Sequence, residues 1–267
     1  PLFAAVMLLW DRLVGVTAAP DQDDPDTMLG ELVFSHPLGI LAQSLVNILD
    51  AMAPAQASGL PELLSARFER LATIRGRAGL IARGSLLQQL AFLRAVAPVW
   101  VDANLMPGLL LHDDEAVDLM SVVARSVAPQ FPDLFNVLKP AIIHALEHNR
   151  TDDGVREMLS GALIGAAFAV IKGQGGFELS GVECRQTLTR VSNTVLARMA
   201  WELSSMLRSN VGADARGAFW AEAISPFLCD YWPNDVSART TEVSENLAHL
   251  PALAGTAFDE AVAVVLD

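Results

Sequence analysis

The sequence contains few cysteines and few tyrosines, and both shortages exclude classes of protein. Its two cysteines, Cys184 and Cys229, cannot build the disulfide framework of a small secreted domain, so they indicate a reducing, cytoplasmic setting. One tyrosine is present, and apolar residues seldom alternate with polar ones at a period of two. Because strands are rich in such residues and in such alternation, the sequence does not indicate a β-sheet protein.

Charged residues are also scarce, and their balance is acidic. They make up 18% of the chain, against 52% hydrophobic residues, and the net charge is −13. A negative protein repels phosphate backbones on average, so the sequence predicts no nucleic-acid partner. The low charged fraction indicates extra buried surface, either within the chain or against other parts of a larger protein.

Long apolar runs are missing as well. The nearest candidate, residues 162–171, stops at Lys172 and is shorter than a membrane span needs. The sequence therefore predicts no membrane segment and no membrane partner.

The chain starts at Pro1 within one apolar stretch and stops in another, residues 258–267. From this we expect a slice of a larger protein, truncated at its C-terminus.

Complete catalytic motifs are absent from the sequence. It contains no G-x-S-x-G elbow, no P-loop and no C-x-x-C pair. Residues 172–176, Lys-Gly-Gln-Gly-Gly, have the wrong glycine spacing for a dinucleotide loop and instead predict a helix C-terminus followed by a loop. The sequence therefore predicts no cofactor and no enzymatic activity in this chain.

Helical signals are abundant. Residues 182–207 carry one apolar stripe at steps of three and four, which predicts a single amphipathic helix with a capping box formed by Ser180 and Glu183. Two prolines inside helical patterns, Pro140 and Pro226, predict a bend or break in their helices. Other prolines stand where helices are predicted to begin, at positions that lose no backbone hydrogen bond: Pro37, Pro61, Pro98 and Pro132.

These signals predict an all-α fold of about ten to twelve helices joined by short loops. Paired helices of similar size favour stacked helix pairs, in a solenoid-like or irregular helical array. Residues 1–26 are predicted to be an N-terminal helix and linker that end a preceding region, with the linker at residues 19–26. Residues 27–267 are predicted to form one helical-repeat-like domain.

One short motif is compatible with catalysis. His144, Glu147 and His148 match H-x-x-E-H, the inverted zinc-protease pattern. Two histidines four residues apart on a helix could bind Zn²⁺ beside Glu147 as general base, and a third ligand would come from a later helix. The alternative, which we favour, is a plain helix C-terminus where histidine meets the negative end of the helix dipole. The available third ligands include Glu178, Glu183, Glu202 and Glu222.

Basic residues cluster in one region, and that cluster is the remaining candidate binding site. Its guanidinium groups could bind a phosphate, a nucleotide or an acidic partner. The alternative is a solvated helix face, with interspersed glycines that let helices approach. The cluster consists of Arg67, Arg70, Arg75, Arg77 and Arg83.

Several segments, taken in order, resemble a known helical region. They include Phe34-Ser-His36-Pro37-Leu-Gly39, the stretch from Leu60-Pro61 through Trp100 to Pro107, and Phe219-Trp220 through Pro226-Phe227 to Tyr231-Trp232-Pro233. Their order is similar to a helical domain of unknown function that lies C-terminal to sirtuin-like or nucleotide-binding domains in bacterial anti-phage defence proteins. The resemblance spans about residues 30–250. It implies a sensor, scaffold or assembly arm beside a separate effector, and it supplies no catalytic residue.

The sequence thus predicts a non-catalytic interaction, sensor or assembly module of a larger bacterial protein. Its expected partners are other domains of the same protein and a protein ligand, with a second copy of the chain as a further option. The competing hypothesis is a zinc-dependent hydrolase built on His144, Glu147 and His148.

Overall fold

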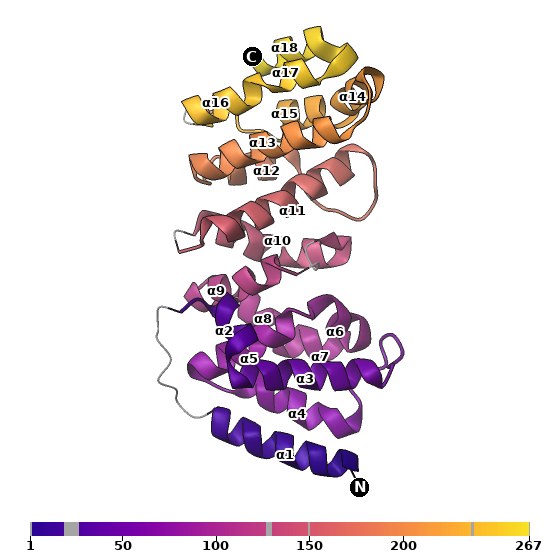
Figure 1. The fold of residues 1–267 in the computed structure, drawn as a ribbon, viewed down its shortest axis with the longest axis vertical. Coiled ribbons are helices and arrows are strands. Elements are labelled where there is room, and N and C mark those ends of the chain that lie inside the picture. The colour runs from indigo at the N-terminus through magenta and orange to yellow at the C-terminus, as the bar shows by residue number, and fades with distance from the viewer. Residues whose placement is uncertain (1, 19–26, 127–129, 149, 236–237, 267) are drawn as a thin grey trace. The chain divides into compact units, whose positions relative to one another are not determined.

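The computed structural model describes residues 2–18, 27–126, 130–148, 150–235 and 238–266 (Figure 1). The described residues form helices, turns and loops, and none of them belongs to a strand. The prediction of an all-α helical array is therefore confirmed. The predicted linker at residues 19–26 lies outside the described residues.

The chain divides into two compact units, Pro1–Ala128 and Pro129–Asp267. The predicted boundary after residue 26 falls inside the first unit, where α1 (Leu2–Thr17) packs against α3 (Pro37–Ala51). The other helices of this unit are α2 (Leu29–Ser35), α4 (Glu62–Thr73), α5 (Gly76–Leu87), α6 (Leu90–Val96), α7 (Pro98–Asn104), α8 (Met106–Leu110) and α9 (Asp114–Ala124).

Helix α5 forms the centre of the first unit. Its residues from Ala78 to Leu87 are buried, with Arg83 as the exception. α5 contacts α2, α3, α4 and α9, so neighbours cover it on several sides (Figure 1). The long run of buried small and apolar residues places α5 in the core, while Arg77 and Arg83 lie at its edge.

The junction of α2 and α3 is built by the His36-Pro37-Leu-Gly39 motif. His36 caps α3 by accepting a hydrogen bond on Nδ1 from the backbone N–H of Leu38 at 3.1 Å. Pro37 occupies the first turn of α3, as the sequence predicts. Gly39 lies so close to α2 that an added Cβ would stand 2.4 Å from the carbonyl oxygen of Val33. The motif therefore sets a close helix–helix contact.

The second unit is held by an aromatic core. Trp220 and Phe227 are fully buried, and the Phe227 ring packs edge-on against Phe168 at a centroid distance of 5.3 Å. Its helices are α10 (Pro132–Glu147), α11 (Asp153–Ile171), α12 (Gly181–Leu188), α13 (Asn193–Ser209), α14 (Ala213–Phe219), the π-helix η2 (Trp220–Ile224), α15 (Ser225–Asp230), α16 (Thr241–Ala248), α17 (Leu250–Leu253), the 3₁₀ helix η4 (Gly255–Ala257) and α18 (Phe258–Leu266).

The prediction of a single helix over residues 182–207 needs correction. The stripe at residues 182–207 is not one helix, because α12 ends at Leu188 and α13 begins at Asn193. Ser192 accepts the backbone N–H of Val195 on its hydroxyl, so it caps a new helix at that point. The predicted cap at Ser180 is confirmed, since its hydroxyl accepts the backbone N–H of Glu183 at 3.1 Å.

The two internal prolines behave differently. α10 runs through Pro140 as one helix, so it does not break there, while the alternative outcome, a bend at Pro140, stays a prediction. The carbonyl of Asn136 loses its usual donor at Pro140, and the side chain of Asn136 contacts the loop after α11, where it donates to the carbonyl of Gly176 and accepts the N–H of Glu178. Near Pro226 the α-helical hydrogen-bond pattern is interrupted, because the π-helix η2 lies between α14 and α15, and Pro226 lies in the first turn of α15.

The glycine-rich segment after α11 ends that helix. Gly173 has a φ of 64°, and the N–H of Gln174 reaches back to the carbonyl of Ala169 at 2.8 Å. This is the predicted helix C-terminus.

Helix α11 is longer than the apolar run that marks it in the sequence. Among the described residues it is the one single helix that is long and apolar enough to cross a membrane. If each of two bent helix pairs is counted as one segment, up to three segments meet the same criteria of length and composition. The expectation that no segment reaches this length is thus corrected, because α11 begins at Asp153 and includes residues before 162. Half of its apolar window is buried inside the structure.

Gly39→Ala is expected to destabilise the first unit by about 1–3 kcal/mol, because the new methyl group would overlap the Val33 carbonyl. The matched control is Gly30→Ala in α2, where an added Cβ meets only the Arg125 side chain at 3.5 Å. The control is expected to be neutral or to stabilise by less than about 1 kcal/mol. Urea unfolding followed by far-UV circular dichroism measures both, and equal midpoints for the two variants would contradict the packing argument.

Candidate functional site

The arginines of the predicted basic cluster lie on α4, on α5 and between them, and their guanidinium groups bond different acceptors. Arg67 and Arg70 belong to α4, Arg75 precedes α5, and Arg77 and Arg83 belong to α5. Arg75 is exposed. The other four guanidinium groups each donate hydrogen bonds to acceptors within the first unit.

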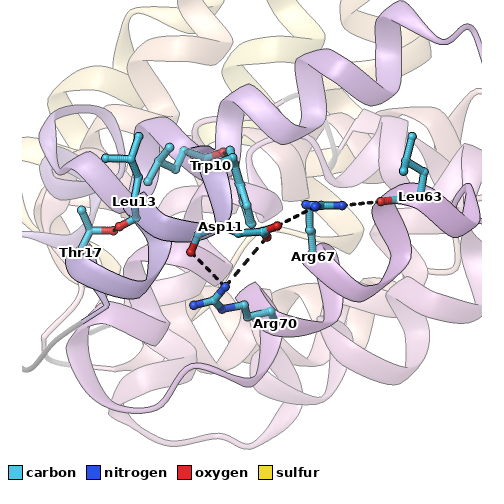
Figure 2. Close-up of polar contacts among 8 residues, drawn as sticks. Trp10, Asp11, Leu13, Thr17, Leu63, Arg67 and Arg70 are labelled. Atoms are coloured by element: carbon cyan, nitrogen blue, oxygen red, sulfur yellow. Dashed lines mark hydrogen bonds and ion pairs between the residues drawn. The ribbon is translucent and has the colours of Figure 1, made fainter. Parts of the chain in front are cut away.

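Arg67 and Arg70 hold α1 against α4 (Figure 2). Arg67 donates through Nη2 to Oδ2 of Asp11 at 2.6 Å and through Nη1 to the carbonyl of Leu63 at 2.7 Å. Arg70 donates to the Asp11 carbonyl at 3.2 Å, and its Nη1 lies 4.0 Å from Oδ1. The Arg67 side chain is 18% exposed and that of Arg70 is 44% exposed. The ion pair of Arg67 with Asp11 is therefore expected to be stronger than that of Arg70 with Asp11, because water screens the less exposed pair less.

Arg77 and Arg83 satisfy backbone carbonyls. Arg77 donates to the carbonyl of Thr27, just before α2. Arg83 donates to the carbonyl of Ile74 at 3.0 Å, where α4 ends, and lies 3.7 Å from Glu115. Burial lowers the pKa of the Arg83 guanidinium, and the charge of Glu115 opposes that shift. These contacts support a structural use of the cluster, and a binding role for it stays a prediction.

The H-x-x-E-H residues lie at the end of α10. His144 is in the last turn, whereas His148 is already outside the helix with an extended backbone, φ −81° and ψ 130°. The two ring centroids are 5.4 Å apart, and Nδ1 of His148 accepts the backbone N–H of Arg150 at 3.3 Å. Glu147 is held elsewhere, because its Oε1 accepts from Arg190 at 2.8 Å.

The chain after α10 is fixed by two contacts to the helix end. The Thr151 hydroxyl donates to the carbonyl of Ala145 at 2.6 Å, and Arg156 donates to the carbonyl of His148 at 2.9 Å. These contacts satisfy carbonyls that a continuing helix would use. They explain why the two histidines do not occupy successive turns of one helix.

A third metal ligand does not join the histidines within the described part of the chain. There, no group of three or more His, Cys, Asp or Glu side chains is placed to hold a metal ion. Of the glutamates suggested by the sequence, Glu183 accepts from Lys139 at 2.9 Å, and Glu202 lies 3.8 Å from Arg198. Burial raises the pKa of Glu202, while Arg198 lowers it and Glu157 raises it further.

A groove that the sequence did not reveal lies in the second unit. Its cavity volume is about 660 Å³, and its walls come from the end of α15, the residues after it, α16 and the end of α18. The lining combines apolar side chains such as Trp232 and Leu247 with Cys229 and Arg239. Sequence reasoning missed it because its walls come from separate helices, and no local motif marks them.

The outer face of α1 is the other feature that sequence reasoning did not single out. We define it as Val6, Leu9, Leu13 and Val16, which are all exposed. An adjoining side of α1 carries Met7, Trp10 and Val14, which are buried. Trp10 also donates its indole N–H to the carbonyl of Leu41 at 3.0 Å. α1 is thus docked on one side and presents apolar side chains on another.

Comparison with known proteins relates the chain to part of a longer bacterial protein. No family model matches it, and no solved structure matches it. It is 26% identical over 274 residues to "Uncharacterized protein y4cA" of Sinorhizobium fredii (strain NBRC 101917 / NGR234). The alignment covers 96% of this chain and 22% of that protein. The chain therefore spans about a fifth of the length of this relative.

Arg67→Ala is expected to destabilise the first unit by about 1–3 kcal/mol, because it leaves the partly buried Asp11 carboxylate without its closest donor. Arg70→Ala makes the same change of charge at a more exposed site and is expected to cost less than about 1 kcal/mol. Denaturant unfolding of both variants measures the difference. A larger loss of unfolding free energy in the Arg70 variant than in the Arg67 variant would show that Arg67 is not the main ion-pair partner of Asp11.

The purified chain is expected to contain no stoichiometric zinc, because His144 and His148 lack a third ligand among the described residues. Elemental analysis of protein prepared in zinc-containing medium provides the measurement. His148→Ala should leave the zinc content unchanged, as should the control His112→Ala outside the motif. One zinc ion per chain that is lost only in the His148 variant would restore the metal hypothesis.

Proposed function

We propose that this chain is a non-catalytic helical module that serves interaction, sensing or assembly inside a larger bacterial protein of the cytoplasm. The observation that carries the proposal is the coverage of the relative: nearly the whole chain aligns with about a fifth of a much longer bacterial protein. A segment of this kind works next to other parts of its polypeptide.

The surface of the first unit supports an interaction role. Helical arrays need a polar outer side on their terminal helices to remain soluble, but the outer face of α1 is apolar. Contiguous exposed apolar side chains mark interaction surfaces. Contact with another part of the polypeptide, or with a protein ligand, would cover them.

The polar residues with catalytic potential support the non-catalytic part of the proposal. Glu147 is paired with Arg190, and Arg67 is paired with Asp11, so both side chains are engaged in holding helices together. The net charge of −13 disfavours nucleic acid as a partner. We extend the proposal, through the resemblance noted above, to a bacterial anti-phage defence protein whose effector chemistry lies in another domain.

The test compares residues 1–267 with the full natural polypeptide in assays of NAD consumption and peptide hydrolysis, and in sedimentation. We expect no turnover by residues 1–267 and self-association driven by the uncovered apolar surface. Glu147→Gln is the matched control, because it removes the one candidate general base while conserving size. If residues 1–267 show turnover and the Glu147→Gln variant does not, the proposed non-catalytic role is wrong and the zinc-hydrolase hypothesis replaces it. An inert monomer would instead indicate a passive spacer.

A further inference from the structure

The groove of the second unit has the size and the lining of a small-molecule site. Its volume of about 660 Å³ falls within the roughly 300–1,000 Å³ of sites that hold one small ligand. Nine of the thirteen described residues that line it are apolar, among them Trp232 and Leu247. Ligand sites combine such an apolar wall with a few polar groups that orient the ligand. Here the polar groups include Cys229, Arg239 and Ser244.

The walls of the groove are held in place by contacts to the rest of the unit. Trp232 is buried, its ring packs against that of Phe227 at a centroid distance of 6.2 Å, and its backbone N–H donates to the carbonyl of Phe227 at 3.0 Å. The end of α15 is also fixed, because Arg185 donates to the carbonyl of Cys229 at 2.8 Å. The hydroxyl of Thr240 caps the first turn of α16. A wall that is ordered before the ligand arrives loses little conformational entropy on binding.

The charge of the lining indicates the sign of the ligand. Acidic residues outnumber basic ones in this chain by 31 to 18, and yet none of the described residues that line the groove is Asp or Glu. Arg239 is the one charged side chain among them, and it is exposed. An anionic group in the groove would therefore meet a guanidinium and no carboxylate among these residues, whereas a cationic group would be repelled by Arg239.

We infer that the groove binds an amphipathic carboxylate, with its apolar part against the apolar wall and its carboxylate on Arg239. The apolar part would displace water from side chains such as Trp232 and Leu247. A guanidinium presents its N–H donors in a planar fork that matches the two oxygens of a carboxylate. This inference goes beyond the proposed function, because it assigns a ligand to the second unit whether the module serves interaction, sensing or assembly.

Alkylation of Cys229 reports on the groove, because this thiol is exposed and belongs to the lining. The full natural polypeptide is treated with iodoacetamide, and the peptide that contains Cys229 is quantified by mass spectrometry. We expect decanoate, below its micelle concentration, to slow this reaction by roughly fivefold or more. Octanoate, which is two methylenes shorter, should need a roughly tenfold higher concentration. Cys184 is the internal control, since it is fully buried and burial raises its pKa to about 12, so it stays unreactive while the unit is folded.

A substitution at Arg239 separates the head group of the ligand from its apolar part. In Arg239→Gln we expect decanoate to bind roughly three- to tenfold more weakly. The neutral probe 1-decanol, which has the same chain without the charge, should protect Cys229 equally in the variant and the natural protein. Arg208→Gln is the matched control, because it removes the same charge from an exposed site outside the groove. An equal loss of decanoate and decanol binding in the Arg239 variant would show that Arg239 only shapes the groove, and it would overturn the assignment of a carboxylate.

The remaining outcomes identify other occupants of the groove. Protection of Cys229 by phosphatidylglycerol vesicles but not by decanoate would identify a membrane surface and overturn the inference. A Cys229 thiol that is unreactive before any amphiphile is added would show that another part of the polypeptide fills the groove, and this result would also overturn it. Turnover by residues 1–267 would contradict the proposed function without changing the alkylation rates, so the two failures are distinguishable.

Discussion

The burial of α5 is the constraint on which the first unit depends. Helices α2, α3, α4 and α9 contact it, and glycine in α5 makes the approach of α2 possible. A Cβ on Gly84 would stand 2.8 Å from a methyl carbon of Val33 in α2, and Gly39 leaves room for α2 at the start of α3. Ser85 then joins the two contacts, because its buried hydroxyl donates to the carbonyl of Gly39 at 2.8 Å. Small residues here do not confer mobility; they let helices pack at short range.

Features set by neighbouring residues were readable from the sequence. The proline-led start of α3, the cap at Ser180 and the end of α11 each depend on side chains within a few residues of the backbone groups they satisfy. The interruption at Pro226 belongs to the same group, because a missing N–H acts within one turn of its own helix. These local effects fixed the all-α class.

Features set by distant residues were not readable. The Asn136 side chain bonds Gly176 and Glu178, about 40 positions away, and Arg67 pairs with Asp11 at a separation of 56 residues. The same limitation affects the candidate site. H-x-x-E-H describes a metal site only if the helix continues to His148, and contacts from Thr151 and Arg156 end it earlier. The sequence shows which residue types are present, but it does not show which donors pair with which acceptors in the folded chain.

Several charged side chains of this chain form pairs between helices. Lys139 with Glu183, Glu147 with Arg190, and Arg198 with Glu157 join different parts of the second unit, as Asp11 and Arg67 join α1 to α4 in the first. Such pairs add little stability where they are exposed, but they select one register of packing over others. Charge committed to internal pairs is not available to solvate outer surfaces. With only 18% of its residues charged, the protein leaves apolar side chains on α1 in contact with water. Covering such side chains with another apolar surface would remove the free-energy cost of their contact with water without requiring additional charge.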